Sequence, residues 1–326
     1  MKFFLPSFFV LPFWYPILST HNISNLAPTK GFLFSEPYVI YKNKDRNYTI
    51  HTDICPHQGA SLSEGKVTKS CNLQCPYHGF EFDNGNFCKI PNPKNPSLKS
   101  FASRIQLPVL NSKKMKDFLF VRFDDNVNQT IFYPPEEFDQ TFKSVEGTVN
   151  INTNYLSVCE NLLDMLHISY VHSFGSLETP LPHHLNFTWC SPYHGKSTFL
   201  YSPNEKTISN KVGKVDTVKV ENEFILPTNT ITRVFAGNTI KTVFTRTIPI
   251  SDTKCILYWK IYRNFWIFPF GDWLIDFLMK KTIQEDLWIL KRLYTKHRDG
   301  PLQTKYDKTI REFRNCYKKY MFNEKK

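Results

Sequence analysis

Two short stretches decide how the first part of this chain folds: CPHQGA at residues 55–60 and CPYHGF at residues 75–80. Each stretch pairs one cysteine with one histidine and contains the turn-forming residues proline and glycine, which is typical of a loop. The four donor residues are Cys55, His57, Cys75 and His78. Two loops that each offer one sulfur and one nitrogen donor predict a single metal centre held between them.

The mixed pairing of these donors distinguishes two kinds of metal centre. A [2Fe–2S] cluster can be held by two thiolates on one iron and two imidazoles on the other. Zinc is the alternative, but zinc sites usually pair cysteine with cysteine and histidine with histidine. Because each pair here contains one residue of each type, the sequence favours the iron–sulfur cluster.

The residues around the two stretches predict an all-β domain over residues 1–128. Residues 30–125 alternate short apolar segments with turn-forming residues. Asp83-Asn84-Gly85-Asn86 predicts a hairpin turn by its Asn-Gly pair. The predicted strands include residues 38–41, 48–52, 80–82 and 118–123.

The second part of the chain changes character after a polar, proline-containing linker at residues 124–137. Residues 154–173 predict one helix that stops near Gly175. Strand-forming residues return between about 185 and 263, and helical patterns follow at 272–297 and 306–320. This order predicts an α+β domain over residues 129–326, with an antiparallel sheet and helices.

A second set of metal donors lies in ENLLDMLHISYVH, residues 160–172. Two imidazoles and one carboxylate form the facial triad of non-haem Fe(II) oxygenases. On a regular helix His167 and His172 point about 140° apart, so we expect a π-bulge or a helix end near His172. The carboxylate must come from elsewhere, and Glu285 and Asp286 are both candidates. Alternatively, these residues are ordinary parts of helix surfaces.

The bulk composition fits a globular protein of one or two domains. The chain has 326 residues, 41 Lys and Arg against 29 Asp and Glu, and a net charge of +12. A basic surface is either simply solvated or attracts nucleic acid, anionic membrane or an acidic protein. Eight cysteines are too few for a disulfide scaffold in a chain of this length, and they favour a reducing compartment.

Two apolar segments bear on membrane contact. Residues 1–18 are apolar, but three prolines interrupt them and no signal-cleavage pattern follows. We therefore expect this segment to be part of the fold, with contact to a membrane surface as an alternative. Residues 262–278 are also unusually apolar, which predicts a pocket mouth, a contact between copies or a membrane contact.

The cluster motif resembles the Rieske protein family. The branch in respiratory and photosynthetic chains has two further cysteines and a serine near the cluster, where this chain has Ala60, Tyr77 and Phe80. Fewer hydrogen bonds to the sulfurs imply a potential toward the low end of the range of roughly −150 to +300 mV. Such a cluster suits delivery of electrons to an O₂-activating iron.

The residue pattern from 161 to 172 resembles the iron site of Rieske non-haem iron oxygenases, most closely the demethylase-type monooxygenases and the chlorophyll-pathway members. The resemblance implies a Rieske domain followed by a helix-grip (START/Bet v1-like) catalytic domain. It assigns His167, His172 and Asp286 as ligands of a mononuclear Fe(II), and Asn161 and Asp164 as catalytic residues. The sequence ends without the C-terminal cysteine pair or anchors of plastid members, which argues against a chlorophyll-type substrate.

The same resemblance implies an electron route and partners. A ferredoxin or flavin reductase would supply electrons to the cluster, and the iron would use them with O₂ to hydroxylate, demethylate or desaturate a small apolar ring substrate. In a homotrimer, His78 of one copy would face Asp164 of the next. We expect a cytoplasmic or organelle location and no nucleic-acid partner.

Two other functions remain alternatives at this point. The first is an electron-transfer Rieske protein without oxygenase activity of its own. The second, which the sequence favours far less, is a zinc module that binds nucleic acid through its basic surface. Iron and sulfide analysis separates all three.

Overall fold

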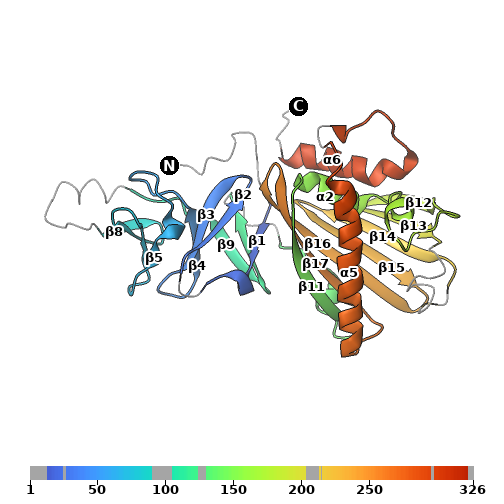
Figure 1. Ribbon diagram of the computed structural model, residues 1–326, viewed down its shortest axis with the longest axis horizontal. Helices are drawn as coiled ribbons and strands as arrows, with labels where there is room; N and C mark the ends of the chain where they lie inside the picture. Colours follow the sequence, from blue (N-terminus) through green and yellow to red (C-terminus); the bar gives the residue numbers. More distant parts are fainter. Residues whose placement is uncertain are drawn as a thin grey trace. The chain divides into compact units, whose positions relative to one another are not determined.

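The computed structural model describes residues 13–24, 27–89, 105–123, 130–202, 213, 215–294 and 297–321 (Figure 1). The chain forms two compact units, Met1–Ile131 and Phe132–Lys326. The domain boundary expected after residue 128 and the apolar segment before residue 13 lie outside the described residues. Each unit is treated by itself below.

The first unit is built from antiparallel strands, as its turn-rich sequence predicts. The described strands form three sheets, ordered β1-β10-β9, β2-β3-β4 and β5-β6-β7-β8. Their bounds are β1 Tyr15–Ser19, β2 Thr29–Leu33, β3 Glu36–Lys42, β4 Tyr48–Thr52, β5 Lys66–Val67, β6 Leu73–Gln74, β7 Glu81–Asp83, β8 Asn86–Lys89, β9 Asn111–Met115 and β10 Phe118–Arg122. The expectation of an all-β first domain is confirmed.

The turn between β7 and β8 shows how the local sequence fixes this unit. Asn84 and Gly85 have φ values of 47° and 81°, which glycine and asparagine tolerate best. The backbone N–H of Asn84 also donates to the hydroxyl of Tyr41 at 3.1 Å, which ties the hairpin to β3. Tyr41, Cys55, Leu73, Cys75 and Phe82 belong to one buried core, so the hairpin and both metal-binding loops share the same packing.

The second unit is a seven-stranded antiparallel sheet in the order β11-β17-β16-β15-β14-β13-β12. The helix α5 lies across this sheet in Figure 1, while α2 and α6 lie near one end of the strands. Strand bounds are β11 Lys143–Ile151, β12 His183–Ser191, β13 His194–Tyr201, β14 Val218–Ile225, β15 Asn229–Ala236, β16 Thr239–Ser251 and β17 Lys254–Arg263. The α+β class, with a long helix over an antiparallel sheet, is confirmed.

The helices of this unit begin and end at recognisable signals. Their bounds are α2 Tyr155–Leu163, α3 Ile168–Val171, α5 Pro269–Leu290 and α6 Lys308–Met321. Pro269 occupies the first turn of α5, where its missing N–H costs nothing, so α5 starts before the expected residue 272. It ends at Leu290, before the expected residue 297.

The single helix expected over residues 154–173 is wrong. The chain leaves α2 at Asp164, whose backbone is extended with ψ of 129°, and it re-enters a helix only at Ile168. The carboxylate of Asp164 accepts the N–H of Leu166 at 2.8 Å, a local turn that competes with helix continuation. The expected helix end near His172 is present, since His172 is extended with ψ of 137°. No π-bulge occurs in this described segment.

The sheet of the second unit has two different faces, because alternate residues of each strand point to opposite sides. On the inner face, the amide of Asn222 donates to the carbonyl of Leu163 in α2 at 3.1 Å, and Phe224 contacts Phe313 of α6. On the outer face, Ile231 and Phe244 pack against residues from the segment that precedes β11. The helices α2 and α6 therefore lie on the inner face of the strands that these contacts involve.

Candidate metal centres

The two loops of the first unit have the same backbone turn. The N–H of Cys55 donates to the carbonyl of Ala60 at 2.8 Å, and the N–H of Cys75 donates to the carbonyl of Phe80 at 2.8 Å. Each loop then passes through a glycine with a positive φ, 74° in the first and 70° in the second. Only glycine adopts this conformation without strain, so the glycines allow both loops to present their donors alike.

The cysteines and the histidines of the two loops differ in their exposure to solvent. Both cysteines are 2% exposed, whereas His57 is exposed and His78 is half-buried. The Nδ1 atoms of the two histidines point at one another and lie 3.1 Å apart. Burial raises the pKa of the Cys55 thiol to about 11, and the neighbouring Cys75 adds to this rise. Cationic iron would offset that cost, because a metal binds the thiolate form.

Buried carboxylates support both loops from behind. Asp53 is 1% exposed, and it accepts the hydroxyl of Ser61 at 2.5 Å and the N–H of Ser63 at 2.6 Å. Beside the second loop, Glu81 accepts the amide of Gln74 at 3.1 Å. The sequence analysis did not identify Asp53 or Glu81, although each lies within two residues of the motif it supports.

The second unit brings three donor side chains to one point. Nε2 of His167 and Nε2 of His172 lie 3.1 Å apart, and Oδ1 of Asp286 lies 3.3 Å from the first and 3.4 Å from the second. The three residues come from the segment after α2, the end of α3 and the last third of α5. Asp286 Oδ1 is buried and accepts no hydrogen bond from any described residue. A divalent cation among these atoms would satisfy all three.

Glu285 occupies a different place from Asp286. Its Oε2 lies 3.0 Å from Nδ1 of His172, on the far side of the imidazole from Asp286. A carboxylate that accepts the Nδ1–H leaves Nε2 with a free lone pair, as metal-binding histidines require. The ring of Phe174 stacks on His172 with centroids 4.8 Å apart and planes 10° apart. The sequence analysis did not predict the contact with Phe174.

His167 is oriented by a neutral acceptor instead. Its Nδ1 lies 3.1 Å from the backbone carbonyl of Asp164, while the carboxylate of Asp164 is 3.8 Å away. Asn161 lies in the last turn of α2, where its carbonyl accepts the N–H of Asp164 at 3.2 Å. Of the two contacts between His167 and Asp164, the one with the backbone oxygen is therefore the shorter.

The pKa values of the two imidazoles are shifted in opposite directions. Burial acts to lower the pKa of His167, but the contact of its Nε2 with Asp286 at 3.3 Å and the charge of Asp164 outweigh it, so that pKa is raised. Burial lowers the pKa of His172, and the adjacent His167 contributes to this decrease. Asp286 raises the pKa of both imidazoles, so its carboxylate favours positive charge at this point of the site.

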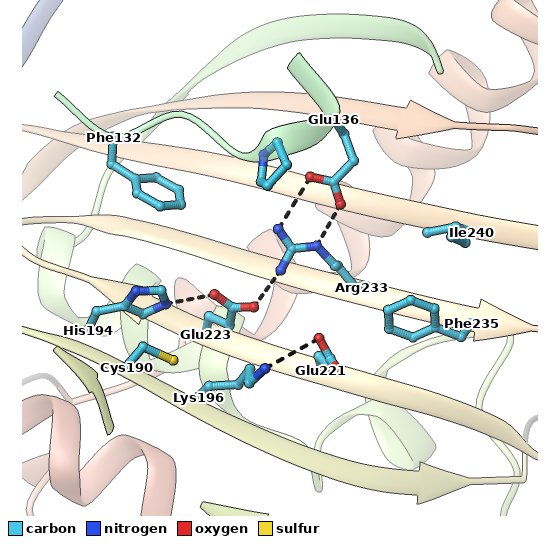
Figure 2. A pocket seen from close by; sticks show the side chains of 11 residues that line it. Phe132, Glu136, Cys190, His194, Lys196, Glu221, Glu223, Arg233, Phe235 and Ile240 are labelled. Atoms are coloured by element: carbon cyan, nitrogen blue, oxygen red, sulfur yellow. Dashed lines mark hydrogen bonds and ion pairs between the residues drawn. The ribbon is translucent and has the colours of Figure 1, made fainter. Parts of the chain in front are cut away.

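A separate hollow of about 440 Å³ lies on the outer face of the sheet. Figure 2 shows its charged side chains in contact with one another. Arg233 binds Glu136 at 2.6 Å and also binds Glu223, which lies 2.7 Å from His194. Burial acts to raise the pKa of both glutamates, but their bonds to Arg233 and His194 outweigh it, and the pKa values are lowered. These paired charges fasten the segment before β11 to the sheet.

A β unit with paired Cys-His loops, joined to a sheet-and-helix unit with a histidine–carboxylate triad, defines the class of iron–sulfur oxygenases. Residues 13–103 match the Rieske [2Fe-2S] domain family, and residues 151–321 match the vanillate O-demethylase oxygenase C-terminal domain family. The second match covers more than half of the chain. The protein therefore belongs to the Rieske oxygenase family, whose members carry a [2Fe–2S] cluster and a mononuclear iron.

Curated relatives match about half of this chain. Chloroplastic pheophorbide a oxygenase from Oryza sativa subsp. japonica is 34% identical over 173 residues, which is 49% of this chain and 32% of the relative. The oxygenase component of dicamba O-demethylase from Stenotrophomonas maltophilia is 29% identical over 168 residues, 50% of this chain and 48% of the relative. The chain thus spans less than half the length of these two relatives in the matched region.

Solved structures share the fold over nearly the whole chain. NdmA of Pseudomonas putida CBB5 with caffeine superposes with a TM-score of 0.77 at 19% identity, covering 93% of this chain and 89% of that one. Apo dicamba monooxygenase gives a TM-score of 0.75 at 17% identity, with 96% and 98% covered. Among the described residues, no helix has both the length and the apolar character that a membrane span needs.

Proposed function

We propose that this protein is a Rieske-type oxygenase that acts on an apolar, ring-containing substrate. One observation carries the proposal: the donor atoms of His167, His172 and Asp286 all lie within 4.8 Å of one another. An electron-transfer protein without oxygenase activity would not need a second donor set of this kind. Hydroxylation, demethylation and desaturation all fit such a site.

The residues would divide the two metal groups between the units. Cys55, His57, Cys75 and His78 would hold the cluster, which passes single electrons, and His167, His172 and Asp286 would hold the iron, which activates O₂. Three protein ligands leave coordination positions open for O₂ next to the substrate. Glu285 and Phe174 would keep His172 oriented, and the carbonyl of Asp164 would do the same for His167.

The proposal includes an external electron donor and electron transfer between copies of the chain. An external ferredoxin or flavin reductase would supply electrons, and the net charge of +12 favours an acidic donor. In a homotrimer, His78 of one copy would face Asp164 of the next. Exposed residues near both positions support this contact between copies. His57 is exposed beside His78, and Tyr170, near Asp164 in sequence, is 70% exposed. Light scattering at several protein concentrations tests the trimer.

Location and membrane contact belong to the same proposal. All eight cysteines are free, which suits a reducing compartment such as the cytoplasm or an organelle interior. Phe270, Trp273 and Phe277 are each more than half exposed and stack along the first turns of α5. We assign this aromatic face to peripheral contact with a lipid surface. Cosedimentation with anionic vesicles, lost in Trp273→Ala, tests this assignment, whereas unchanged vesicle binding overturns it.

Iron and sulfide analysis after anaerobic purification tests the function directly. We expect about three irons and two sulfides per chain, because one [2Fe–2S] cluster and one mononuclear iron are present. About two irons and two sulfides would instead support the electron carrier. O₂ uptake should then be measured with aromatic, sterol and tetrapyrrole compounds and a ferredoxin–reductase pair.

A further inference from the structure

Tyr201 is a buried tyrosine of β13 whose ring packs against the segment that carries the histidines of the triad. It is 3% exposed, and it belongs to the same buried core as Met165, against which the half-buried Ile168 also packs. In the chain Met165 and Ile168 lie on either side of His167. The ring of Tyr201 is therefore part of the core that supports the backbone around the first histidine of the triad.

The hydroxyl of Tyr201 contacts the chain on both sides of the second histidine, His172. It lies 2.9 Å from the hydroxyl of Ser169 in α3, and it accepts the backbone N–H of Ser176 at 3.0 Å. Ser169 precedes His172 in the chain, and Ser176 follows it. One side-chain oxygen thus joins the helix that ends before His172 to the bend that comes after it.

The hydrogen bonds between these groups have a defined direction. Ser169 donates its single hydroxyl proton to the carbonyl of Pro180 at 3.1 Å. The hydroxyl of Tyr201 must then donate to Ser169, because two hydroxyls that share a hydrogen bond need one donor between them. Tyr201 thus gives its proton to Ser169 and a lone pair to Ser176, and all three residues are buried. Loss of this hydroxyl would leave two buried partners without their hydrogen bond.

The bend after His172 packs directly against α3. The N–H of Gly175 donates to the carbonyl of His172 at 2.9 Å, and a Cβ at Gly175 would lie only 2.2 Å from the carbonyl oxygen of Ile168. The same bend carries Phe174, whose ring stacks on the imidazole of His172. A bond between the bend and α3 therefore constrains the backbone of His172 together with the ring that packs against its side chain.

We propose that Tyr201 is a positioning residue of the mononuclear metal site, and that its hydroxyl holds His172 in the orientation that metal binding requires. The inference rests on the proposed oxygenase function, because it needs a metal at the triad. Among the described residues, Tyr201 shares no hydrogen bond with the three donor side chains, so it acts through the backbone on which they are carried. Glu285 orients the imidazole ring of His172, whereas Tyr201 fixes the backbone that bears this ring. Partners of this kind set metal affinity because they restrict the orientations of a ligand.

Metal binding by Tyr201→Phe tests the proposal, because this variant keeps the buried ring and removes only the hydroxyl. The protein with its cluster intact and oxidised would be freed of mononuclear iron by a chelator and then titrated with Fe(II) or Co(II). We expect the variant to bind Fe(II) about tenfold more weakly than the parent protein. The EPR spectrum of bound Co(II), which reports the geometry of its ligands, should also differ from that of the parent. Parent-like affinity or an unchanged spectrum overturns the proposal.

Tyr258→Phe is the matched control for the loss of a buried tyrosine hydroxyl. Tyr258 is 8% exposed, and its hydroxyl donates to Glu146 at 2.7 Å on the outer face of the sheet. We expect the control to keep the parent affinity and the parent Co(II) spectrum, even where its unfolding temperature falls as much as that of Tyr201→Phe. A control that changes the spectrum in the same way as Tyr201→Phe would show a general effect of lost stability and would contradict the proposal.

Ser169→Ala tests the same hydrogen bond from its other end, and it serves as the test if Tyr201→Phe does not fold. We expect Ser169→Ala to weaken Fe(II) binding as well. The double variant should weaken binding by less than the product of the two single effects, because both substitutions remove one shared hydrogen bond. Parent-like Fe(II) affinity of Ser169→Ala, or single effects that multiply in full, would contradict the proposal.

Iron and sulfide analysis of the parent protein separates this inference from the proposed function. A parent protein with about three irons and two sulfides per chain, together with a Tyr201→Phe variant of parent affinity, retains the function and loses only the inference. A parent protein that binds no metal at the triad loses both.

Discussion

The cluster-binding loops and the histidine–carboxylate triad are assembled from the chain in opposite ways. All four donors of the first centre lie between Cys55 and His78, on two loops with the same backbone hydrogen bonds. In the second centre, 113 residues separate His172 from Glu285, the neighbour of Asp286. The first centre therefore depends on local turns, and the second depends on the packing of α5 against the rest of its unit.

This difference indicates which structural changes would displace the donors of each centre. A loop that folds through its own hydrogen bonds keeps its donors in place when a distant helix is altered. A triad that joins distant segments needs the tertiary fold first, and its ligands then need separate partners to orient them. The predictions below test whether the two centres can be lost independently.

The largest expected effect is loss of the mononuclear iron alone. Asp286→Ala removes the only anionic donor of the triad, so we expect turnover to fall to background and iron to drop to the content of the cluster. The EPR signal of the reduced cluster should remain, because no donor of the first unit changes. Turnover that persists in this variant would show that Asp286 is not a ligand.

The reciprocal change should remove the cluster alone. Cys75→Ala leaves an iron of the cluster without one thiolate, and we expect loss of sulfide and of the brown absorption. The triad should still bind one iron per chain, measured after Fe(II) addition and desalting. Loss of iron from both centres would show that the two units do not fold independently.

Asp164→Asn should uncouple electron delivery from iron binding. The backbone carbonyl that orients His167 is retained, so iron content should change less than twofold, while turnover should fall by about tenfold or more. Stopped-flow reoxidation of the reduced cluster measures the electron-transfer step directly. An equal decrease of iron content and turnover would instead indicate a structural role for Asp164.

The last prediction concerns the support of His172, where we expect iron to remain bound but less tightly. Glu285→Gln keeps a hydrogen-bond acceptor for Nδ1–H but removes its charge, and we expect iron affinity to weaken by about 10–100-fold. Asp276→Asn is the matched control, because Asp276 lies on the same helix and pairs only with the exposed Lys280 at 2.7 Å among described residues. Competition with a chelator measures both affinities. Equal values would contradict the positioning role.

The first centre, which is local in sequence, could be predicted more fully than the second, which joins distant segments. The residues of the first centre were identifiable because motif, turn chemistry and donors all lie in two short stretches. At the second centre the residue pattern presents His167 and His172 but leaves both Glu285 and Asp286 as candidates, because the distinction depends on which side of α5 meets His172. Only the family resemblance selects Asp286. The break at Asp164 was missed because its side-chain turn competes with a helix that the surrounding apolar residues favour.

The strand β11 was also missing from the sequence-based prediction. Its residues, Lys143–Ile151, alternate between exposed and half-buried along an edge strand, so they lack the apolar runs that indicate the central strands. By contrast β15 to β17 all lie within the region predicted to form strands, because they are rich in β-branched and aromatic residues. Burial in the centre of the sheet thus made a strand recognisable from its sequence.

Alternation along β15 has a consequence for how this protein can change over evolutionary time. Arg233 joins the closed set of charges on the outer face, while its neighbours Thr232 and Val234 point to the inner face. Substitutions at inner positions can therefore change the side of the strand that faces Asn222 and the inner core while the outer charges still hold the sheet together. The two sides of one strand can thus change independently of each other.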